Sequence, residues 1–187
     1  RRAIAQATRF GVELLSPQEV VDINLVDNYK IITLADGHTI NTKCVIITTG
    51  VDYRSLDAVG IERFTGSGIY YGAATTEAHI CRQQDVYIVG GGNSAGQAAM
   101  YLATYANKVH IVIRKKDLSE TMSKYLIDQI SDTHNIEILS ETTIIEVFGN
   151  DRLTHVMLTS SNGQTRQAAA AALFIFIGAR PVTDWLQ

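Results

Sequence analysis

The chain has 187 residues, of which 46% are apolar and 19% charged, and this composition suits one globular domain or two small lobes. Its formal net charge of −3 gives no reason to expect nucleic acid or an anionic membrane as a partner, and no apolar stretch reaches the ~20 residues of a membrane span. The two cysteines, Cys44 and Cys81, match neither a CxxC motif nor a zinc-binding spacing. We therefore expect a reducing, cytoplasmic setting, no metal site, no thiol-redox pair, and a buried apolar role for each cysteine.

The first third of the chain is predicted to hold a helix and a series of short strands. Residues 1–10 place apolar side chains on one face of a helix, which Gly11 would end. Strands are expected at residues 12–16, 18–25, 29–34, 38–42 and 44–48. The last of them is expected to be buried and ends in Thr48-Thr49-Gly50, after which residues 52–66 are polar and irregular, as in a linker.

The second part of the chain alternates strands and helices before it becomes a run of strands. Strands are expected at 86–89, 109–113 and 136–139, and helices at 76–82, 95–105 and 117–132. An antiparallel meander is expected at 142–148, 153–158 and 164–170, and a final buried strand at 173–177. The alternation of strand and helix predicts an α/β fold with a parallel sheet. His110 lies inside a predicted strand, so we expect a packing or surface role for it.

A glycine-rich turn is the strongest functional signal in the sequence. Gly90-x-Gly92-x-x-Ala95 follows an apolar strand directly and opens a helix, which is the context of a dinucleotide-binding turn. Gly90 would allow the tight turn, Gly92 would let the backbone approach a pyrophosphate, and Ala95 would let the helix pack closely on the strands. The N–H groups at the helix start, with Ser94 as a further donor, would bind the phosphates. The alternative is a tight strand–helix turn in a domain that binds no nucleotide.

The end of the next strand indicates which dinucleotide binds. NAD sites usually have an acidic residue about 20 residues after the glycines, where it binds the ribose hydroxyls. This chain has Arg114-Lys115-Lys116 there and no acid at the strand tip. A cationic cluster suits the 2′-phosphate of NADPH, which arginine can bind with two parallel hydrogen bonds and lysine as a point charge. The alternative is a basic turn that is only solvated.

The order of these pieces resembles a known enzyme family. A meander that ends in a hydrophobic strand and Thr-Gly is followed by a linker, Gly-x-Tyr-Tyr, the glycine turn with its basic second strand, another meander, and Phe-x-x-Ile-Gly-x-x-Pro. Together they resemble the thioredoxin reductase branch of the FAD-dependent pyridine nucleotide-disulfide oxidoreductases. The resemblance implies a Rossmann-like, three-layer NADPH-binding domain with a β-meander at residues 67–178, preceded by part of an FAD-binding lobe at 1–66. Residues 179–187 would return toward the FAD domain.

The resemblance also assigns residues to cofactors. The positions that match the family's NADPH-phosphate turn are Gly90, Gly91, Gly92, Asn93, Ser94 and Ala95. Arg114 and Lys115 match its two basic residues for the 2′-phosphate, and Lys116 extends the cluster. Thr48, Thr49 and Gly50 resemble a segment close to bound flavin, and Ile177 and Gly178 resemble the crossing near the nicotinamide.

Two departures from the family pattern bear on activity. The family's redox motif Cys-Ala-Thr-Cys corresponds here to Gly72, Ala73, Ala74 and Thr75, so neither a dithiol nor a catalytic residue is expected at that place. The first FAD fingerprint would precede residue 1, and the last FAD segment would follow residue 187. We therefore interpret the chain as an incomplete, inactive fragment of a longer flavoprotein that does not hold FAD firmly by itself, and the resemblance suggests a homodimer.

The function that the resemblance implies is transfer of hydride from NADPH to FAD and then to an acceptor other than a local disulfide. The identity of this acceptor stays open. One alternative is a ferredoxin–NADP reductase of the thioredoxin-reductase-like type, which also lacks the cysteine pair. Another is a module that binds NADPH in order to report redox state to a regulatory domain. A third is a structural domain that binds no nucleotide.

Overall fold

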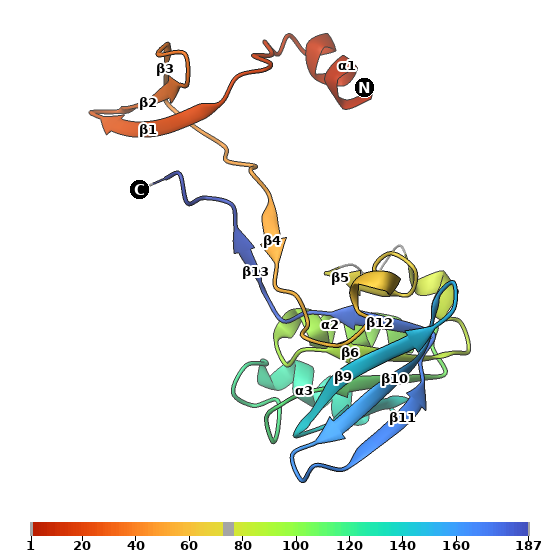
Figure 1. Ribbon diagram of the computed structural model, residues 1–187. Helices are drawn as coiled ribbons and strands as arrows, with labels where there is room; N and C mark the ends of the chain where they lie inside the picture. Colours follow the sequence, from red (N-terminus) through yellow and green to blue (C-terminus); the bar gives the residue numbers. More distant parts are fainter. Residues whose placement is uncertain (1, 73–76, 187) are drawn as a thin grey trace. The chain divides into compact units, whose positions relative to one another are not determined.

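The computed structural model describes residues 2–72 and 77–186, and Figure 1 shows their backbone. The chain forms two compact units, of which one consists of Arg1–Val51 with Pro181–Gln187 and the other of Asp52–Arg180. The chain therefore passes from one unit to the other twice. The strands at these two passages, β4 (Val51–Tyr53) and β13 (Ala179–Pro181), pair with each other.

The smaller unit holds a short helix and a three-stranded antiparallel sheet. Helix α1 spans Arg2–Arg9, and the strands β1 (Val20–Val26), β2 (Tyr29–Leu34) and β3 (Thr39–Thr42) pair in the order β1-β2-β3. The turns between the strands use residues that tolerate a left-handed backbone, with φ of 51° at Asp27 and 87° at Gly37. The predicted helix and these three predicted strands are thus confirmed.

Two further strands that the sequence predicts do not form. Residues 12–16 and 44–48 are irregular, and no strand among the described residues pairs with them. An apolar run without a partner strand leaves its backbone groups unpaired, so apolar character alone does not make a strand. Cys44 consequently lies exposed and its predicted burial is wrong, whereas Cys81 in the larger unit is fully buried, as predicted.

The larger unit has three layers, with a parallel sheet in the middle (Figure 1). The sheet runs in the order β5-β12-β6-β7-β8, with strands at Ile69–Tyr71, Ala172–Ile175, Asp85–Val89, Lys108–Val112 and Ile136–Leu139. One face is covered by α2 (Asn93–Ala103) and α3 (Lys124–Asp132), and the 3-10 helix η2 (Ala78–Cys81) precedes β6. The other face is covered by the antiparallel meander β9 (Thr142–Gly149), β10 (Leu153–Ser160) and β11 (Thr165–Ala169). The predicted α/β fold with its meander is therefore confirmed.

The central strands carry apolar side chains on both faces, as a parallel sheet with two covered faces requires. On β6, Val86 and Ile88 pack in the core beneath the helices, whereas the alternate residues Tyr87 and Val89 pack against the meander. Gly96 lies where the two helices touch, and an added Cβ there would be 2.6 Å from Cδ2 of Leu126. The missing side chain at Gly96 therefore lets α2 and α3 approach closely.

The segment before the sheet packs on the larger unit and is not a free linker. Val59 joins the meander strand β9 through two backbone hydrogen bonds of 2.9 Å. Ile61 and Phe64, beside and within the 3-10 helix η1 (Glu62–Phe64), are buried. The compact unit consequently begins at Asp52. The predicted boundary between an FAD lobe and an NADPH domain near residue 67 stays a prediction.

The helix predicted over residues 117–132 begins only at Lys124. The Asp117 carboxylate accepts hydrogen bonds from the N–H of Ser119 at 2.8 Å and from its hydroxyl at 2.5 Å, and such a local turn competes with a helix. Leu118 and Met122 are buried although they precede the helix. We call residues 117–123 the rim loop, because it is anchored in the core beside the glycine turn.

Candidate functional site

A cleft of about 1070 Å³ opens in the larger unit at the carboxyl ends of the central strands. Its walls come from the glycine turn after β6, the tip of β7, the start of β9 and the end of β12. Residues that follow β4 complete the wall, together with Tyr53: Arg54, Ser55, Leu56 and Asp57. Open α/β sheets bind their ligands outside the carboxyl ends of the strands, so this cleft is where the fold would hold one.

The glycine turn contains two glycines with different physical roles. Gly90 has a φ of 141°, and an added Cβ would lie 2.4 Å from the carbonyl oxygen of Phe176, so the fold itself excludes a side chain. Gly92, the residue before α2, has a φ of −92°, and an added Cβ would meet only the Thr121 carbonyl oxygen at 3.9 Å among the atoms described. The fold does not require a glycine at position 92, and its missing side chain leaves space at the helix start.

Helix α2 begins at Asn93 and presents its first turn to the cleft. That turn has no acidic residue, so its backbone N–H groups and the positive end of the helix dipole suit an anion. Oδ1 of Asn93 accepts hydrogen bonds from the N–H of Ser123 at 2.8 Å and from its hydroxyl at 3.1 Å, which ties the turn to the start of α3. Ser94 is exposed and lines the cleft, whereas Ala95 is fully buried and lets the helix pack on the sheet.

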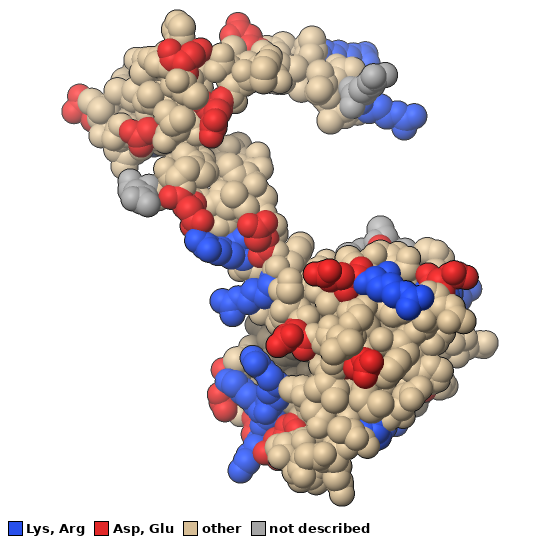
Figure 2. Space-filling model, in the orientation of Figure 1, with Lys and Arg blue, Asp and Glu red and all other residues tan. Residues whose placement is uncertain are grey.

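The tip of β7 brings Arg114 and Lys115 to the cleft, while Lys116 is exposed and lies outside its lining. The Lys115 ammonium is paired with the carboxylate of Glu120 in the rim loop. Arg114 forms no ion pair with any residue in the described ranges. Figure 2 shows basic and acidic side chains close together on the surface over the segment between β7 and α3. Of the two cations that line the cleft, Lys115 is therefore already paired with a carboxylate and Arg114, within the described residues, is not.

The rim loop borders the cleft beside these cations. The Thr121 hydroxyl donates a hydrogen bond to the Gly91 carbonyl at 2.7 Å, which joins the loop to the glycine turn. The Asp117 carboxylate lines the cleft, and hydrogen bonds from the hydroxyl and N–H of Ser119 hold the pKa of that carboxyl below its ordinary value. Two carboxylates, Asp117 and Glu120, thus stand beside the cations although no acid lies at the strand tip itself.

A further part of the cleft lies where the chain leaves the sheet, at Ile177 and Gly178. Gly178 has a φ of 99°, and its carbonyl accepts a hydrogen bond from the N–H of Arg54 at 3.1 Å. Tyr53 and Gly72 line the same space, and an added Cβ on Gly72 would lie 2.7 Å from Cε1 and from the hydroxyl oxygen of Tyr53. The tyrosine ring thus fills the place where a side chain at position 72 would begin. The rest of the redox-motif position, Ala73, Ala74 and Thr75, lies outside the described residues.

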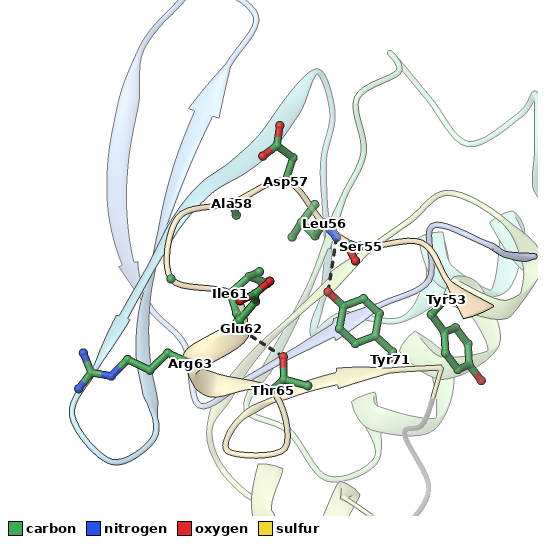
Figure 3. A pocket seen from close by; sticks show the side chains of 11 residues that line it. Tyr53, Ser55, Leu56, Asp57, Ala58, Ile61, Glu62, Arg63, Thr65 and Tyr71 are labelled. Carbon is green, nitrogen blue, oxygen red and sulfur yellow. Dashed lines mark hydrogen bonds between the residues drawn. The ribbon is translucent and has the colours of Figure 1, made fainter. Parts of the chain in front are cut away.

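A second hollow of about 790 Å³ shares a wall with the cleft (Figure 3). Both are lined by Tyr53, Ser55, Leu56 and Asp57. The remaining lining consists of Ala58, Gly60, Ile61, Glu62, Arg63, Thr65 and Tyr71. The Tyr71 hydroxyl accepts a hydrogen bond from the N–H of Leu56 at 3.4 Å, and the ring centroids of Tyr71 and Tyr53 lie 6.2 Å apart. Tyr71 therefore holds the segment after β4 against β5.

The residues that resemble a flavin-side segment belong to the smaller unit. The Thr49 hydroxyl donates to the Val182 carbonyl at 2.6 Å, and the Val182 N–H donates to the Gly50 carbonyl at 3.1 Å. Gly50 has a φ of 85°, and Thr48 precedes this pair in an irregular segment. These bonds join two stretches of the smaller unit, and a role beside flavin stays a prediction.

Three further observations limit the chemistry of the chain. Within the described ranges, no group of three or more His, Cys, Asp or Glu side chains is placed to hold a metal ion. Burial raises the pKa of the Cys81 thiol to about 11, so this cysteine is not a thiolate at neutral pH. None of the helices described has the length and apolar character that crossing a membrane requires.

Several residues that line the cleft or stand beside it were not predicted from the sequence. Thr121 and Glu120 lie in a stretch whose pattern indicates a helix, and Tyr53 lies in one that indicates a linker. The partner of Thr121 is 30 residues away in the chain, so no local pattern could reveal the contact. The one available signal was the pair of acids that follow the basic cluster, Asp117 and Glu120.

Comparison with known proteins relates the whole chain to one family. Residues 2–187 match the family described as pyridine nucleotide-disulphide oxidoreductase. The chain is 34% identical over 181 residues to a thioredoxin reductase of Streptomyces clavuligerus, which covers 96% of this chain and 55% of that protein. The solved thioredoxin reductase from Giardia duodenalis is similar with a TM-score of 0.84 at 28% identity, over 100% of this chain and 60% of that one. The one from Streptococcus pyogenes has a TM-score of 0.76 at 32% identity, over 97% and 58%.

The family match covers nearly all of the residues, and similarity in sequence and similarity in fold both point to proteins named thioredoxin reductase. The chain spans about half the length of the curated relatives it matches, at 55% of the first two. It contains the glycine turn and the cationic strand tip that the resemblance to thioredoxin reductases rests on. The chain therefore belongs to the pyridine nucleotide-disulphide oxidoreductase family, in its thioredoxin-reductase-like branch.

Proposed function

We propose that the larger unit binds NADPH in the cleft at the carboxyl ends of β6 and β7. The pyrophosphate would lie on the glycine turn and the first turn of α2, the 2′-phosphate at Arg114 and Lys115, and the nicotinamide toward Ile177 and Gly178. The observation that carries this proposal is the space at Gly92, because the fold has no need of a glycine there and a side chain would fill the front of the helix N-terminus. The cations at the tip of β7 favour a nucleotide with a 2′-phosphate.

For the whole flavoprotein, we propose that electrons from NADPH reach an acceptor that is not a disulfide of this chain. Bound FAD would supply the hydride-accepting chemistry, and the Thr48–Gly50 segment of this chain would lie beside it. The chain's own part is to orient the nicotinamide and to keep thiols out of the site. Gly72 carries no thiol and Tyr53 fills the space beside it, while Cys81 is buried with a raised pKa. These features support an acceptor outside the described residues.

Calorimetric titration of the chain with NADPH and with NADH tests the nucleotide site. We expect NADPH to bind about tenfold more tightly, because the 2′-phosphate adds a charge-assisted hydrogen bond. Arg114→Ala should remove most of this advantage and leave the affinity for NADH within about twofold. Lys124→Ala, which removes an exposed and ion-paired lysine from α3, is the matched control and should change neither affinity. Equal affinity of the unmodified chain for both nucleotides would contradict the 2′-phosphate assignment, and binding of neither would contradict the site itself.

The ferredoxin–NADP reductase alternative uses the same NADPH site and differs only in the electron acceptor. The lack of a thiol at Gly72 suits it equally well. Reduction of ferredoxin by the whole flavoprotein, compared with reduction of quinone or oxygen, separates the two functions. A module that only senses NADPH predicts nucleotide binding without flavin reduction, so loss of flavin absorbance on addition of NADPH would exclude it.

A further inference from the structure

The cationic tip of β7 carries an ion pair that a 2′-phosphate would have to disturb. Lys115 lines the cleft, and its ammonium pairs with the Glu120 carboxylate. The side chains are 49% and 64% exposed, so water screens the pair and either member can move. In the absence of a ligand, the Lys115 ammonium therefore faces the Glu120 carboxylate.

Glu120 belongs to a loop that is held firmly against the cleft. Its neighbours Leu118 and Met122 are 2% and 5% exposed, so both sides of the loop are anchored in the core. The Thr121 hydroxyl adds a hydrogen bond of 2.7 Å to the Gly91 carbonyl in the glycine turn. Because the backbone on both sides of Glu120 is fixed, the carboxylate stays within reach of the Lys115 ammonium.

We propose that Glu120 is a specificity-determining residue that lowers the preference of the cleft for NADPH over NADH. Its carboxylate serves as an internal counter-ion of Lys115 and so competes with a 2′-phosphate for this ammonium. NADPH must displace this carboxylate and bring further negative charge close to it, whereas NADH, which has a 2′-hydroxyl, need not. The inference rests on the proposed nucleotide site and adds the residue that sets its selectivity.

Asp117 acts in the same direction from the start of the rim loop. Its carboxylate lines the cleft, accepts two hydrogen bonds from Ser119 and interacts electrostatically with Lys115. Lys115 is thus faced by two carboxylates, whereas Arg114 forms no ion pair within the described part of the chain. Arg114 is therefore the main ligand of a 2′-phosphate, and Lys115 contributes fully only when the Glu120 carboxylate is removed.

The test compares Glu120→Gln with Asp128→Asn by calorimetric titration with NADPH, NADH and adenosine 2′,5′-bisphosphate. Each variant removes one carboxylate from an exposed lysine–carboxylate pair, but the Lys124–Asp128 pair lies on α3 and outside the lining of the cleft. Glu120→Gln should tighten NADPH and the bisphosphate about two- to fivefold, the factor that one exposed charge pair is worth, and leave NADH unchanged. Asp128→Asn should change none of the three affinities.

Lys115→Ala provides a second arm. In the unmodified chain this change should weaken NADPH binding by less than about twofold, since Glu120 already engages the ammonium. In the Glu120→Gln background the same change should weaken it about two- to fivefold, because the freed ammonium then binds the phosphate. Additive effects of the two substitutions would overturn the proposal.

The outcomes also separate this inference from the proposed function. Equal tightening of NADPH and NADH by Glu120→Gln would show an effect of overall charge and overturn the role of Glu120. Unchanged NADPH affinity in Glu120→Gln would also overturn the role of Glu120. The proposed function would still stand in that case if the unmodified chain prefers NADPH and Arg114→Ala removes this preference. If neither the unmodified chain nor Glu120→Gln binds a nucleotide, the inference and the proposed function fail together.

Discussion

Gly90 and Gly92 stand two positions apart, yet a methyl group would meet different surroundings at each. At Gly90 it would press on the carbonyl oxygen of Phe176 at 2.4 Å and would have to adopt a φ of 141°. At Gly92 the φ of −92° is open to any residue, and the nearest described contact is at 3.9 Å. Gly90 is therefore required by the fold, whereas Gly92 leaves space for a ligand at the N-terminus of α2.

This contrast predicts opposite results for two alanine substitutions. Gly90→Ala should lower the free energy of unfolding by about 3 kcal/mol, because it adds a backbone clash to an unfavourable φ. Gly92→Ala should leave that free energy within about 1 kcal/mol, since alanine also restricts the unfolded chain, but should weaken NADPH binding at least about tenfold. Urea unfolding and calorimetric titration measure the two effects. Unchanged NADPH affinity in Gly92→Ala would contradict the proposed position of the pyrophosphate.

Among the elements, β7 carries a titratable side chain into the interior. His110 is 6% exposed, and its ring stacks on that of Tyr87 with the centroids 4.5 Å apart. Its Nδ1 lies 3.1 Å from Oε2 of Glu137 on β8 without a hydrogen bond to it. Burial lowers the pKa of His110 more than the Glu137 carboxylate raises it. The remaining charges that face the ring oppose one another, since Lys108 and Arg166 lower this pKa and Asp85 raises it. The layer between the sheet and the meander therefore holds a neutral histidine.

A buried neutral histidine makes the larger unit less stable in acid. The unfolded chain takes up a proton at this residue near its ordinary pKa of about 6.5, whereas folded His110 stays neutral to lower pH. Lowering the pH below about 6.5 therefore favours the unfolded state, by at most about 1.4 kcal/mol per pH unit for one group.

Urea unfolding at about pH 7.5 and about pH 5.5 measures this loss in the unmodified chain, and His110→Phe should reduce it. His134→Gln, at an exposed position, is the control and should leave the loss unchanged. The pKa of Glu137 is lowered mainly by its hydrogen bond with Lys108. Its contribution to stability is therefore lost only as the pH falls below about 4.5, which is below both of these pH values. If His110→Phe retained the full loss, another group would be responsible for it.

The sequence predicts an element correctly where neighbouring residues alone determine it, and fails where a distant part of the chain does. The strands β6 to β12 and the glycine turn depend on apolar periodicity and on residues within one turn, so their pattern indicates them correctly. Residues 44–48 show an apolar pattern but form no strand, since a strand also needs a partner. The rim loop has helical spacing, yet the local hydrogen bonds of Asp117 and the burial of Leu118 hold it as a turn. The Thr121–Gly91 contact depends on tertiary structure and has no signature in the sequence.

Over the whole molecule, the buried core is divided very unevenly between the two units. Of the buried apolar residues described, Leu34 alone belongs to the smaller unit, and all the others belong to Asp52–Arg180. A sheet that leaves its side chains exposed gains little free energy from apolar burial. The stability of the chain should therefore reside in the larger unit.

This distribution predicts that residues 52–180 fold without the rest of the chain. Expressed alone, they should unfold cooperatively in urea, and their affinity for NADPH should stay within about twofold of that of the whole chain. Residues 1–51 alone should show no cooperative transition, because they lack a core. Circular dichroism and calorimetry provide the two readouts. Loss of NADPH binding by a folded 52–180 fragment would mean that the smaller unit contributes to the site.

The contact between Tyr53 and Gly72 also has a consequence for engineering a thiol into the cleft. A cysteine at position 72 would place its Cβ 2.7 Å from the tyrosine ring and would have to adopt the φ of 68° that glycine has there. Tyr53 is 49% exposed, so its ring has room to rotate toward solvent. The left-handed backbone stays unfavourable for cysteine in either case. A designed thiol at this place therefore costs stability through the backbone even after the tyrosine has moved aside.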